Sequence, residues 1–238
     1  MPENTTNSTL FLDAFTEIEL KLKELCKVQF HLPFLELVHK AQWNSPVVKK
    51  YANDLREFAE LRNAIIHTRR DDYVIAEPHT GVVNEIVKIK DMLYDPPRVS
   101  RLTSNNIYTV TPSAPLTDLL KTFATKNIMR CPVIDKQRIV ALISAKTLAY
   151  CFAAKYPLKL TPDTPVSEIL SFTDPADFSI ISLRTNLFEV YDQFKKSLKS
   201  GKNLQAILIT NDGSDKAPVL GIVTPSDLPG VFDMIGGV

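Results

Sequence analysis

The chain carries one pattern of predicted elements twice, and this repeat limits the possible folds more than any other feature of the sequence. Residues 107–148 predict a strand, a turn with proline, an amphipathic helix, two strands and a hydroxyl residue that opens a helix. Residues 178–228 predict the same order, so that Leu116 corresponds to Leu187 and Ser144 to Thr224. Two copies of one supersecondary unit predict a pseudo-symmetric pair.

The end of the second copy has the features of a nucleotide-binding junction. The apolar run Val219–Val223 predicts a buried strand, and Thr224 and Pro225 follow it. A hydroxyl residue before a proline is typical of a helix start, where free backbone N–H groups favour a phosphate. Asp227 lies one turn further on, where its carboxylate can accept hydrogen bonds from a vicinal diol. The alternative is that Asp227 is only a first-turn carboxylate favoured by the helix dipole.

The segments IYTVTPSAPLTDLLKTFATKNIMRCPVID and VLGIVTPSDL resemble the cystathionine-β-synthase (CBS) repeat in the order and spacing of their motifs. The resemblance covers residues 98–238, with a first repeat at 98–157 and a second at 163–238. It implies an α+β protein in which an N-terminal all-α helical bundle precedes a tandem CBS-domain pair. It also implies an adenine nucleotide as ligand, with AMP, ATP, cyclic di-AMP and S-adenosylmethionine all open.

The resemblance also assigns ligand-binding residues in the second copy. The adenine slot is expected to be formed by Ile181, Ser182, Ala206 and Ile222. The phosphate and ribose are expected beside the segment that consists of Thr224, Pro225, Ser226 and Asp227.

The first copy departs from this pattern. Ser144 keeps the hydroxyl, but Thr147 stands where the acid is expected, which weakens a ribose site there. Because the two repeats of such a pair pack face to face, we expect Arg130 and Lys146 to lie toward ligand phosphates. The alternative is that both cations are solvated surface residues.

Composition and charge exclude several other classes of protein. A hydrophobic content of 45% with 23% charged residues is ordinary for a soluble globular protein. No apolar run approaches the ~18 residues of a membrane-spanning helix, and the N-terminus lacks the pattern of a signal peptide. The three cysteines are scattered, which favours a reducing cytoplasm, and the net charge of +1 shows no overall bias toward polyanions. The four histidines show no metal-ligand spacing, so no metal cofactor is expected.

Residues 1–95 predict a separate helical bundle. Apolar residues recur every three or four positions over residues 9–29, a shorter apolar stretch covers 32–38, and a third helix is expected to begin at Ser45 and Pro46. A last helix carries Val82, Ile86, Ile89 and Leu93 on one stripe. The segment Asp95–Arg98 contains consecutive prolines, which disfavour helix and predict a stiff linker.

The third helix carries an Arg-Asn-x-x-x-His motif at Arg62, Asn63 and His67. The motif resembles that of HEPN domains, some of which are metal-independent ribonucleases whose polar residues meet across a dimer cleft. Arg62 and His67 lie roughly 140° apart around a helix, so two chains would be needed to bring them together. The alternative is structural, with Arg62 paired to an acid such as Glu60 and His67 at a helix end.

Three functions follow from these observations. The first is a cytosolic regulatory sensor in which the CBS pair binds an adenine nucleotide and controls the helical domain. The second is a ligand-gated ribonuclease, with Arg62, Asn63 and His67 acting on RNA. The third is a dimerisation or partner-docking protein without catalysis. A homodimer is also expected, because the repeat pair resembles modules that associate through their helices and because Arg62 and His67 would need two chains to meet. Apolar residues of the closing helix are expected at its interface: Leu228, Val231, Phe232 and Ile235.

Overall fold

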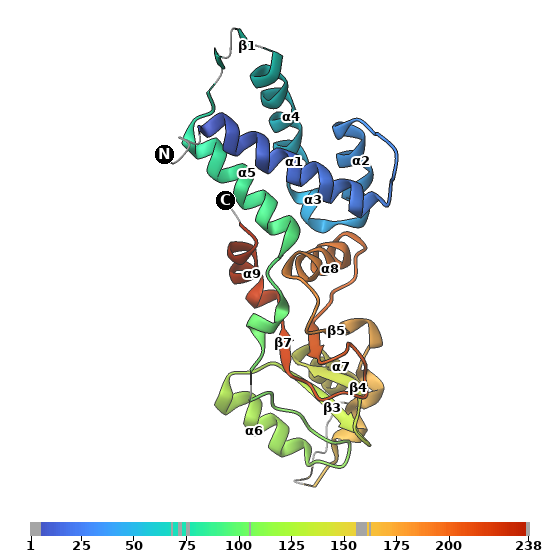
Figure 1. Ribbon diagram of the computed structural model, residues 1–238. Coiled ribbons are helices and arrows are strands. Elements are labelled where there is room, and N and C mark those ends of the chain that lie inside the picture. Colours follow the sequence, from blue (N-terminus) through green and yellow to red (C-terminus); the bar gives the residue numbers. More distant parts are fainter. Residues whose placement is uncertain are drawn as a thin grey trace. The chain divides into compact units, whose positions relative to one another are not determined.

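The computed structural model describes residues 6–67, 69–70, 73–74, 77–104, 106–155, 161 and 163–236. The side chains of 67, 69–70 and 73–74 lie outside this description. The chain divides into two compact units, Met1–Pro97 and Arg98–Val238. Figure 1 shows the helices of the first unit and the mixed helices and strands of the second. No helix in the described ranges is both long and apolar enough to cross a membrane.

The N-terminal unit is built almost entirely from helices. Its elements are α1 (Asn7–Cys26), α2 (Phe34–Asn44), α3 (Pro46–Lys50), α4 (Ala52–His67), β1 (Arg69–Arg70), β2 (Tyr73–Val74) and α5 (Thr80–Tyr94). Helix α1 packs against α2, α4 and α5, and Figure 1 shows α1 and α5 side by side. The expected stripe of α1 is confirmed, since Phe11, Ile18 and Leu22 are fully buried. Burial of this face stabilises a helix that its sequence alone would leave marginal.

Three details of this unit differ from the sequence-based expectation. The helix expected at 32–38 continues to Asn44. The helix expected from Ser45 onward is interrupted at Tyr51, so it consists of α3 and α4. Its start is as predicted, because the Ser45 hydroxyl accepts a hydrogen bond from the Val48 N–H at 3.3 Å and proline holds the first position. The short antiparallel pair β1–β2 follows α4 and was not predicted.

The C-terminal unit contains the two copies in sequence. The first comprises η1 (Val99–Leu102), α6 (Leu116–Lys126), β3 (Arg130–Asp135), β4 (Arg138–Ser144) and α7 (Ala145–Ala154). The second comprises η2 (Val166–Phe172), η3 (Pro175–Asp177), β5 (Phe178–Ser182), α8 (Leu187–Lys199), β6 (Ala206–Thr210), β7 (Gly221–Val223), η4 (Pro225–Asp227) and α9 (Leu228–Met234). The sequence predicts the middle and closing strands at 130–135 and 139–143 in the first copy, and at 204–210 and 219–223 in the second. All four are confirmed to within two residues.

Both copies share one strand topology. In the second copy β5 pairs parallel with β6, and β6 pairs antiparallel with β7. In the first copy β3 pairs antiparallel with β4, but the entry strand, which was expected to end over residues 109–112, is reduced to a single parallel bridge between Val110 and Val133. Two hydrogen bonds hold that bridge, from Val110 N–H to Pro132 O at 3.2 Å and from Ile134 N–H to Val110 O at 2.8 Å. The pseudo-symmetry of the strands is therefore present, with a shortened edge in the first copy.

A small apolar cluster joins the two copies. Ile139 and Leu142 of β4 lie in one buried cluster with Ala206 and Leu208 of β6. Ala206 and Leu208 share a face because alternate residues of a strand point the same way. Ile139 and Leu142 are three positions apart, and the register of β3 with β4 shifts between their partners. Because the cluster fixes one sheet against the other, it also fixes the polar ends of both β4 and β7.

Gly221 at the start of β7 meets a steric requirement of this packing. A Cβ at this position would lie 2.9 Å from Ile209 Cδ1 and 3.1 Å from the carbonyl oxygen of Leu102. Any larger residue would push β7 away from its neighbours.

Replacing Leu142 by Ala should destabilise the C-terminal unit. Leu142 is fully buried in the cluster that joins the copies, and a Leu→Ala change in a core costs about 2–5 kcal/mol through lost burial and the cavity left behind. Urea denaturation measures this loss, with Val140→Ala on the exposed face of β4 as control. Equal losses of unfolding free energy in the two variants would contradict the assigned role of the cluster.

Candidate functional site

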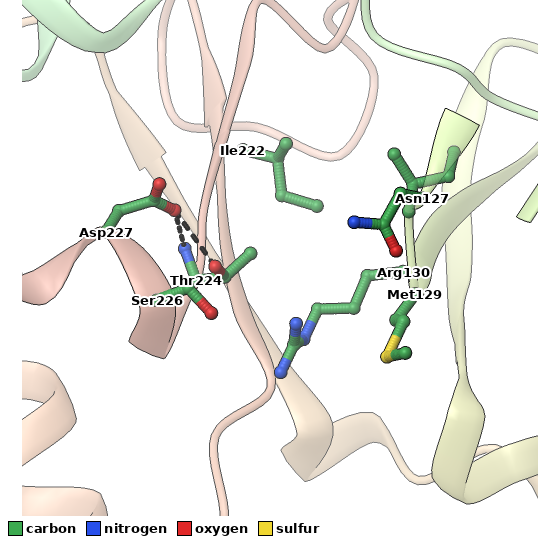
Figure 2. A pocket seen from close by; sticks show the side chains of 8 residues that line it. Asn127, Met129, Arg130, Ile222, Thr224, Ser226 and Asp227 are labelled. Atoms are coloured by element: carbon green, nitrogen blue, oxygen red, sulfur yellow. Dashed lines mark hydrogen bonds between the residues drawn. The ribbon is translucent and has the colours of Figure 1, made fainter.

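The closing turn of the second copy is held by one carboxylate. Strand β7 ends at Val223, Thr224 is extended (φ −123°, ψ 167°), and the chain then makes the short 3-10 turn η4 before α9. The Oδ2 atom of Asp227 accepts hydrogen bonds from the Thr224 backbone N–H at 2.7 Å and from the Thr224 hydroxyl at 2.9 Å (Figure 2). Asp227 therefore does act as a first-turn carboxylate, as the alternative to ligand binding expected. Among the described residues Oδ1 has no hydrogen-bond donor, and it remains able to accept one from a ligand.

The corresponding turn of the first copy is closed. Thr147 N–H donates to Ser144 Oγ at 3.3 Å, and Ser144 N–H donates to Thr147 Oγ1 at 3.1 Å. Both side chains are buried, Thr147 completely. The two hydroxyl residues that correspond to Thr224 and Asp227 thus satisfy each other inside the protein.

A pocket of about 460 Å³ lies between the closing turn of the second copy and the helix–strand turn of the first. It is lined by Asn127, Ile128, Met129, Arg130, Ile222, Thr224, Ser226 and Asp227. We call it the Arg130 pocket. Asn127 ends α6 in the left-handed conformation (φ 51°), which asparagine tolerates better than most residues. This sharp turn carries the chain directly from α6 into the pocket wall.

Arg130 is the single cation in the lining of this pocket. Its Nε atom is buried and has no hydrogen-bond partner among the described residues. Burial lowers the pKa of the guanidinium, while the charge of Asp227 acts in the opposite direction. In Figure 2 the side chain extends from beside Met129 toward Thr224 and Ser226. Arginine presents its N–H groups in a planar fork that suits phosphate, so an anion in the pocket would satisfy this buried donor.

One known protein family matches the first copy of the repeat. Residues 99–154 match the family model of the CBS domain. The chain contains a CBS domain. No curated protein matches the sequence.

Several solved structures are similar to the CBS region at low sequence identity. They include the CBS domain pair of protein MJ0100 in complex with 5′-methylthioadenosine and S-adenosyl-L-methionine (18% identity, 58% of this chain and 98% of that one, TM-score 0.43). Another is formed by the CBS domains of a transcriptional regulator from Streptococcus pneumoniae (16%, 57% and 99%, TM-score 0.43). A third is CBSX2 in complex with AMP (18%, 58% and 98%, TM-score 0.39).

The structure brings together part of the ligand site expected from the sequence. Five of the expected residues line the Arg130 pocket: Arg130, Ile222, Thr224, Ser226 and Asp227. Pro225 lies between two of them and is exposed, but it does not line the pocket. Ile181 and Ala206 are buried, Ala206 completely and in the cluster that joins the copies, while Ser182 is half-buried on β5. None of these last three lines the pocket.

Two expected residues of the first copy lie elsewhere. Ser144 is buried against Thr147, and Lys146 forms an ion pair with Asp177 at 2.8 Å. Sequence analysis missed Asn127, Ile128 and Met129 in the Arg130 pocket. The clue in the sequence is that they form the link between the first amphipathic helix and the strand that begins with Arg130.

A second polar pocket occurs in the helical unit. It has a volume of about 350 Å³ and is lined by Phe15, Glu19, His31, Pro33, Phe34, Leu35, Ala59, Glu60, Arg62 and Asn63. Arg62 Nη1 donates to Asn63 Oδ1 at 3.3 Å. Within the described part of the chain, no ion pair joins Arg62 to an acid. The expected pairing of Arg62 with an acid such as Glu60 is therefore not found among the described residues. The side chain of His67 lies outside the described residues.

Replacing Arg130 by Met should not destabilise the protein in the absence of ligand. A buried donor without a partner costs about 1–3 kcal/mol, and methionine removes this donor while keeping an apolar chain of similar length. We expect the unfolding free energy in urea to remain unchanged or to rise. Lys121→Met, on the exposed part of α6, serves as control. A loss greater than about 1 kcal/mol relative to the control would show that Arg130 has a structural partner.

Proposed function

We propose that the C-terminal unit is a regulatory CBS pair that binds one adenine nucleotide in the Arg130 pocket and alters the state of the helical unit. One observation carries this proposal. The buried Nε of Arg130 has no partner in the described chain and lies in the same pocket as Asp227, which keeps one carboxylate oxygen unoccupied by donors of the described residues.

Each part of the pocket can contact a different part of a nucleotide. The guanidinium of Arg130 would donate to the phosphate, and Oδ1 of Asp227 would accept from the ribose hydroxyls. Ile222 and Ile128 supply apolar surface for a flat base. The hydrogen bonds from Thr224 to Oδ2 hold the carboxylate in one orientation, which reduces the entropy lost when the ligand binds. AMP and ATP carry all of these groups, while cyclic di-AMP carries the base and the phosphates but only the 2′-hydroxyl on each ribose.

The experiment is a titration with AMP, ATP and cyclic di-AMP, followed by calorimetry and thermal denaturation. At least one of them should raise the melting temperature, because a ligand that binds only the folded state stabilises it by mass action. Asp227→Ala and Arg130→Met should each weaken binding about tenfold or more, since a hydrogen bond to a charged group contributes about 1.5–3 kcal/mol. Lys121→Met should retain the wild-type affinity. Equal affinity in wild type and both pocket variants would overturn the assignment.

The proposed sensor acts as a homodimer. The sequence suggested an interface on the closing helix, but two of its four apolar residues, Val231 and Ile235, are buried within the chain. A third, Phe232, packs on Tyr191 with 5.7 Å between ring centroids. Helix α9 therefore offers a partner less apolar surface than expected. Sedimentation of the titration samples tests the dimer, and a monomer at micromolar concentration with and without nucleotide would contradict it.

A second candidate function is RNA cleavage by the helical unit. The observation that favours it is the pocket that contains Arg62 and Asn63 together with His31, from the segment between α1 and α2. Histidine can move a proton near neutral pH, and an arginine can stabilise the charge that develops on a phosphorane. His31 reaches this pocket within one chain, whereas His67 was expected to act across a dimer. With neither histidine active, the helical unit would be a docking bundle.

The test of this second function uses single-stranded RNA in the presence of chelator, with and without the identified nucleotide. If the wild-type protein cleaves this RNA, the Arg62→Ala variant should lose the activity and keep the wild-type melting temperature. His31→Ala and His67→Ala identify the proton-transfer group, because loss of activity in only one of them shows which histidine acts. His39→Ala, exposed on α2 and outside the pocket, is the matched control. No cleavage by wild type under any of these conditions would reject the ribonuclease.

A further inference from the structure

The C-terminal unit contains a second pocket that is related to the Arg130 pocket by the pseudo-symmetry of the two copies. It has a volume of about 640 Å³ and is lined by Lys146, Tyr150, Asp174, Ala176, Asp177, Gly201, Lys202, Asn203 and Gln205. We call it the Lys146 pocket. Each pocket combines the helix–strand turn of one copy with residues that follow the closing strand of the other. The relation between the copies would therefore predict two equivalent ligand sites.

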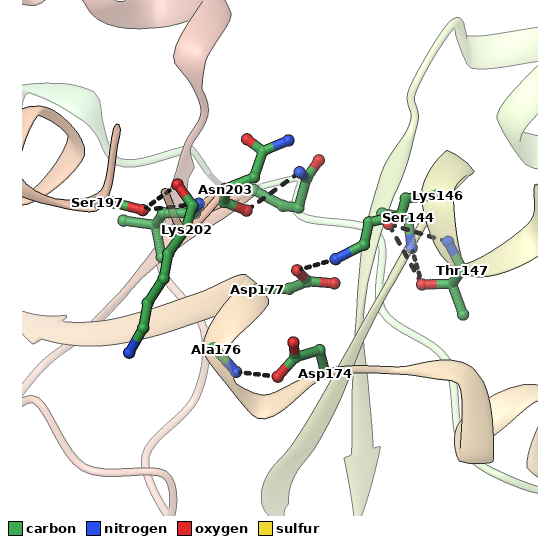
Figure 3. Close-up of polar contacts among 11 residues, drawn as sticks. Ser144, Lys146, Thr147, Asp174, Ala176, Asp177, Ser197, Lys202 and Asn203 are labelled. Carbon is green, nitrogen blue, oxygen red and sulfur yellow. Dashed lines mark hydrogen bonds and ion pairs between the residues drawn. The ribbon is translucent and has the colours of Figure 1, made fainter. Parts of the chain in front are cut away.

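Of the two lysines that line this pocket, Lys146 already has an anionic partner in the protein. Lys146 Nζ lies 2.8 Å from Asp177 Oδ1, and Figure 3 shows the two side chains pointing toward each other. The Asp177 side chain is only 4% exposed, against 33% for Lys146. The hydrogen bond with Asp177 raises the pKa of the Lys146 ammonium, against the smaller effect of burial. Arg130 differs from Lys146 in this respect, because its buried Nε has no partner in the described chain.

Asp177 is held in this position by its backbone. Its N–H donates to the carbonyl oxygen of Asp174 at 2.9 Å, and its own carbonyl oxygen accepts from the N–H of Gln205 at 2.6 Å. These bonds fix the start of β5 beside the start of β6. The backbone of Asp177 is therefore fixed at the point from which its buried carboxylate reaches Lys146.

The other groups of the pocket do not restore an anion site. Asp174 adds a second carboxylate, whose Oδ1 accepts from Ala176 N–H at 2.8 Å. Lys202 is exposed and extends away from the ion pair in Figure 3. Lys146 also lies over the ring of Tyr150, 5.8 Å from its centroid. Thr147, which takes the place of the ribose-binding acid, is completely buried and bonded to Ser144.

We propose that Asp177 is a specificity-determining residue that acts as a built-in anion, excluding phosphate-bearing ligands from the Lys146 pocket so that each chain binds one nucleotide. This inference rests on the proposed nucleotide site in the Arg130 pocket. A phosphate that approached Lys146 would lie beside the Asp177 carboxylate and be repelled by its charge. If it displaced Asp177 instead, it would leave a buried carboxylate without its cation, which is strongly unfavourable. The ion pair also links α7 of the first copy to η3 of the second, directly before β5.

The first test is the stoichiometry of the full-length wild-type protein, measured by calorimetry with whichever nucleotide binds. We expect one nucleotide per chain. The double variant Lys146→Met with Asp177→Asn removes both charges of the ion pair together. It should still bind one nucleotide, with an affinity within about twofold of wild type. This change is much smaller than the tenfold loss of affinity that corresponds to about 1.4 kcal/mol. Two nucleotides per wild-type chain, or loss of the one site in the double variant, would overturn the proposal.

The second test does not depend on nucleotide binding. It uses inorganic pyrophosphate as the probe in an Arg130→Met background, where the Arg130 pocket lacks its cation. Asp177→Asn in this background should strengthen pyrophosphate binding at least tenfold, and a further Lys146→Met change should remove the gain. Circular dichroism and thermal denaturation verify that each variant is folded. An unchanged pyrophosphate affinity in a folded Asp177→Asn protein would show that the ion pair is only structural.

The two tests separate the failure of this inference from failure of the proposed function. If no nucleotide binds the wild-type protein, the proposed function is rejected, and the pyrophosphate result alone decides whether Asp177 excludes anions from Lys146. If one nucleotide binds but Asp177→Asn gains no affinity for pyrophosphate, the nucleotide site stands and the role of Asp177 falls.

Discussion

The apolar contact between β4 and β6 holds the strands of the two copies against each other. Leu142 and Leu208 are fully buried in this contact and come from different copies of the repeat. Burial of a leucine side chain contributes about 1.5–3 kcal/mol, so the cluster is large enough to fix the two small sheets against each other. Each polar turn then lies opposite the turn of the other copy. Both pockets follow from this arrangement, since neither copy forms one alone.

Pseudo-symmetric packing creates two similar pockets, but the charges within them differ. The Arg130 pocket holds a buried donor without a partner in the described chain, and a carboxylate that is held by Thr224. In the Lys146 pocket Asp177 compensates the charge of Lys146, and the second lysine of the lining, Lys202, is exposed. A buried unsatisfied group lowers stability and is retained most readily where a ligand uses it. The same backbone arrangement thus produces one pocket that is suited to an anionic ligand and one in which the Asp177 carboxylate takes the place of that ligand.

The order of the elements could be predicted from the sequence because it depends on local patterns. Periodic apolar residues predicted α1 and α5, and Ser45 with Pro46 predicted the start of α3. The interruption at Tyr51 and the bridge at Val110 could not be predicted in this way, since both depend on packing against other elements. The motif around Thr224 correctly predicted the residues on one side of the Arg130 pocket, which are Thr224, Ser226 and Asp227.

The remaining features of the sites depend on contacts between residues far apart in the chain. Lys146 and Asp177 are separated by 31 positions, and no sequence pattern indicates that they pair. His31 enters the pocket of Arg62 through the loop between α1 and α2, which has no regular spacing relative to α4. Ala206 was expected at the adenine, but the contact between the sheets buries it completely. Tertiary packing decides which of the polar and small residues in a motif remain accessible.

The most direct test of the central claim is the NMR signal of the Arg130 Nε–H group, assigned by its absence from the spectrum of Arg130→Met. In the free protein this donor has no partner in the described chain. An adenine nucleotide that binds in the Arg130 pocket should shift its proton resonance downfield and slow its exchange with water, because a charge-assisted hydrogen bond forms to the phosphate. An Nε–H signal that remains unchanged at saturating nucleotide would contradict the account.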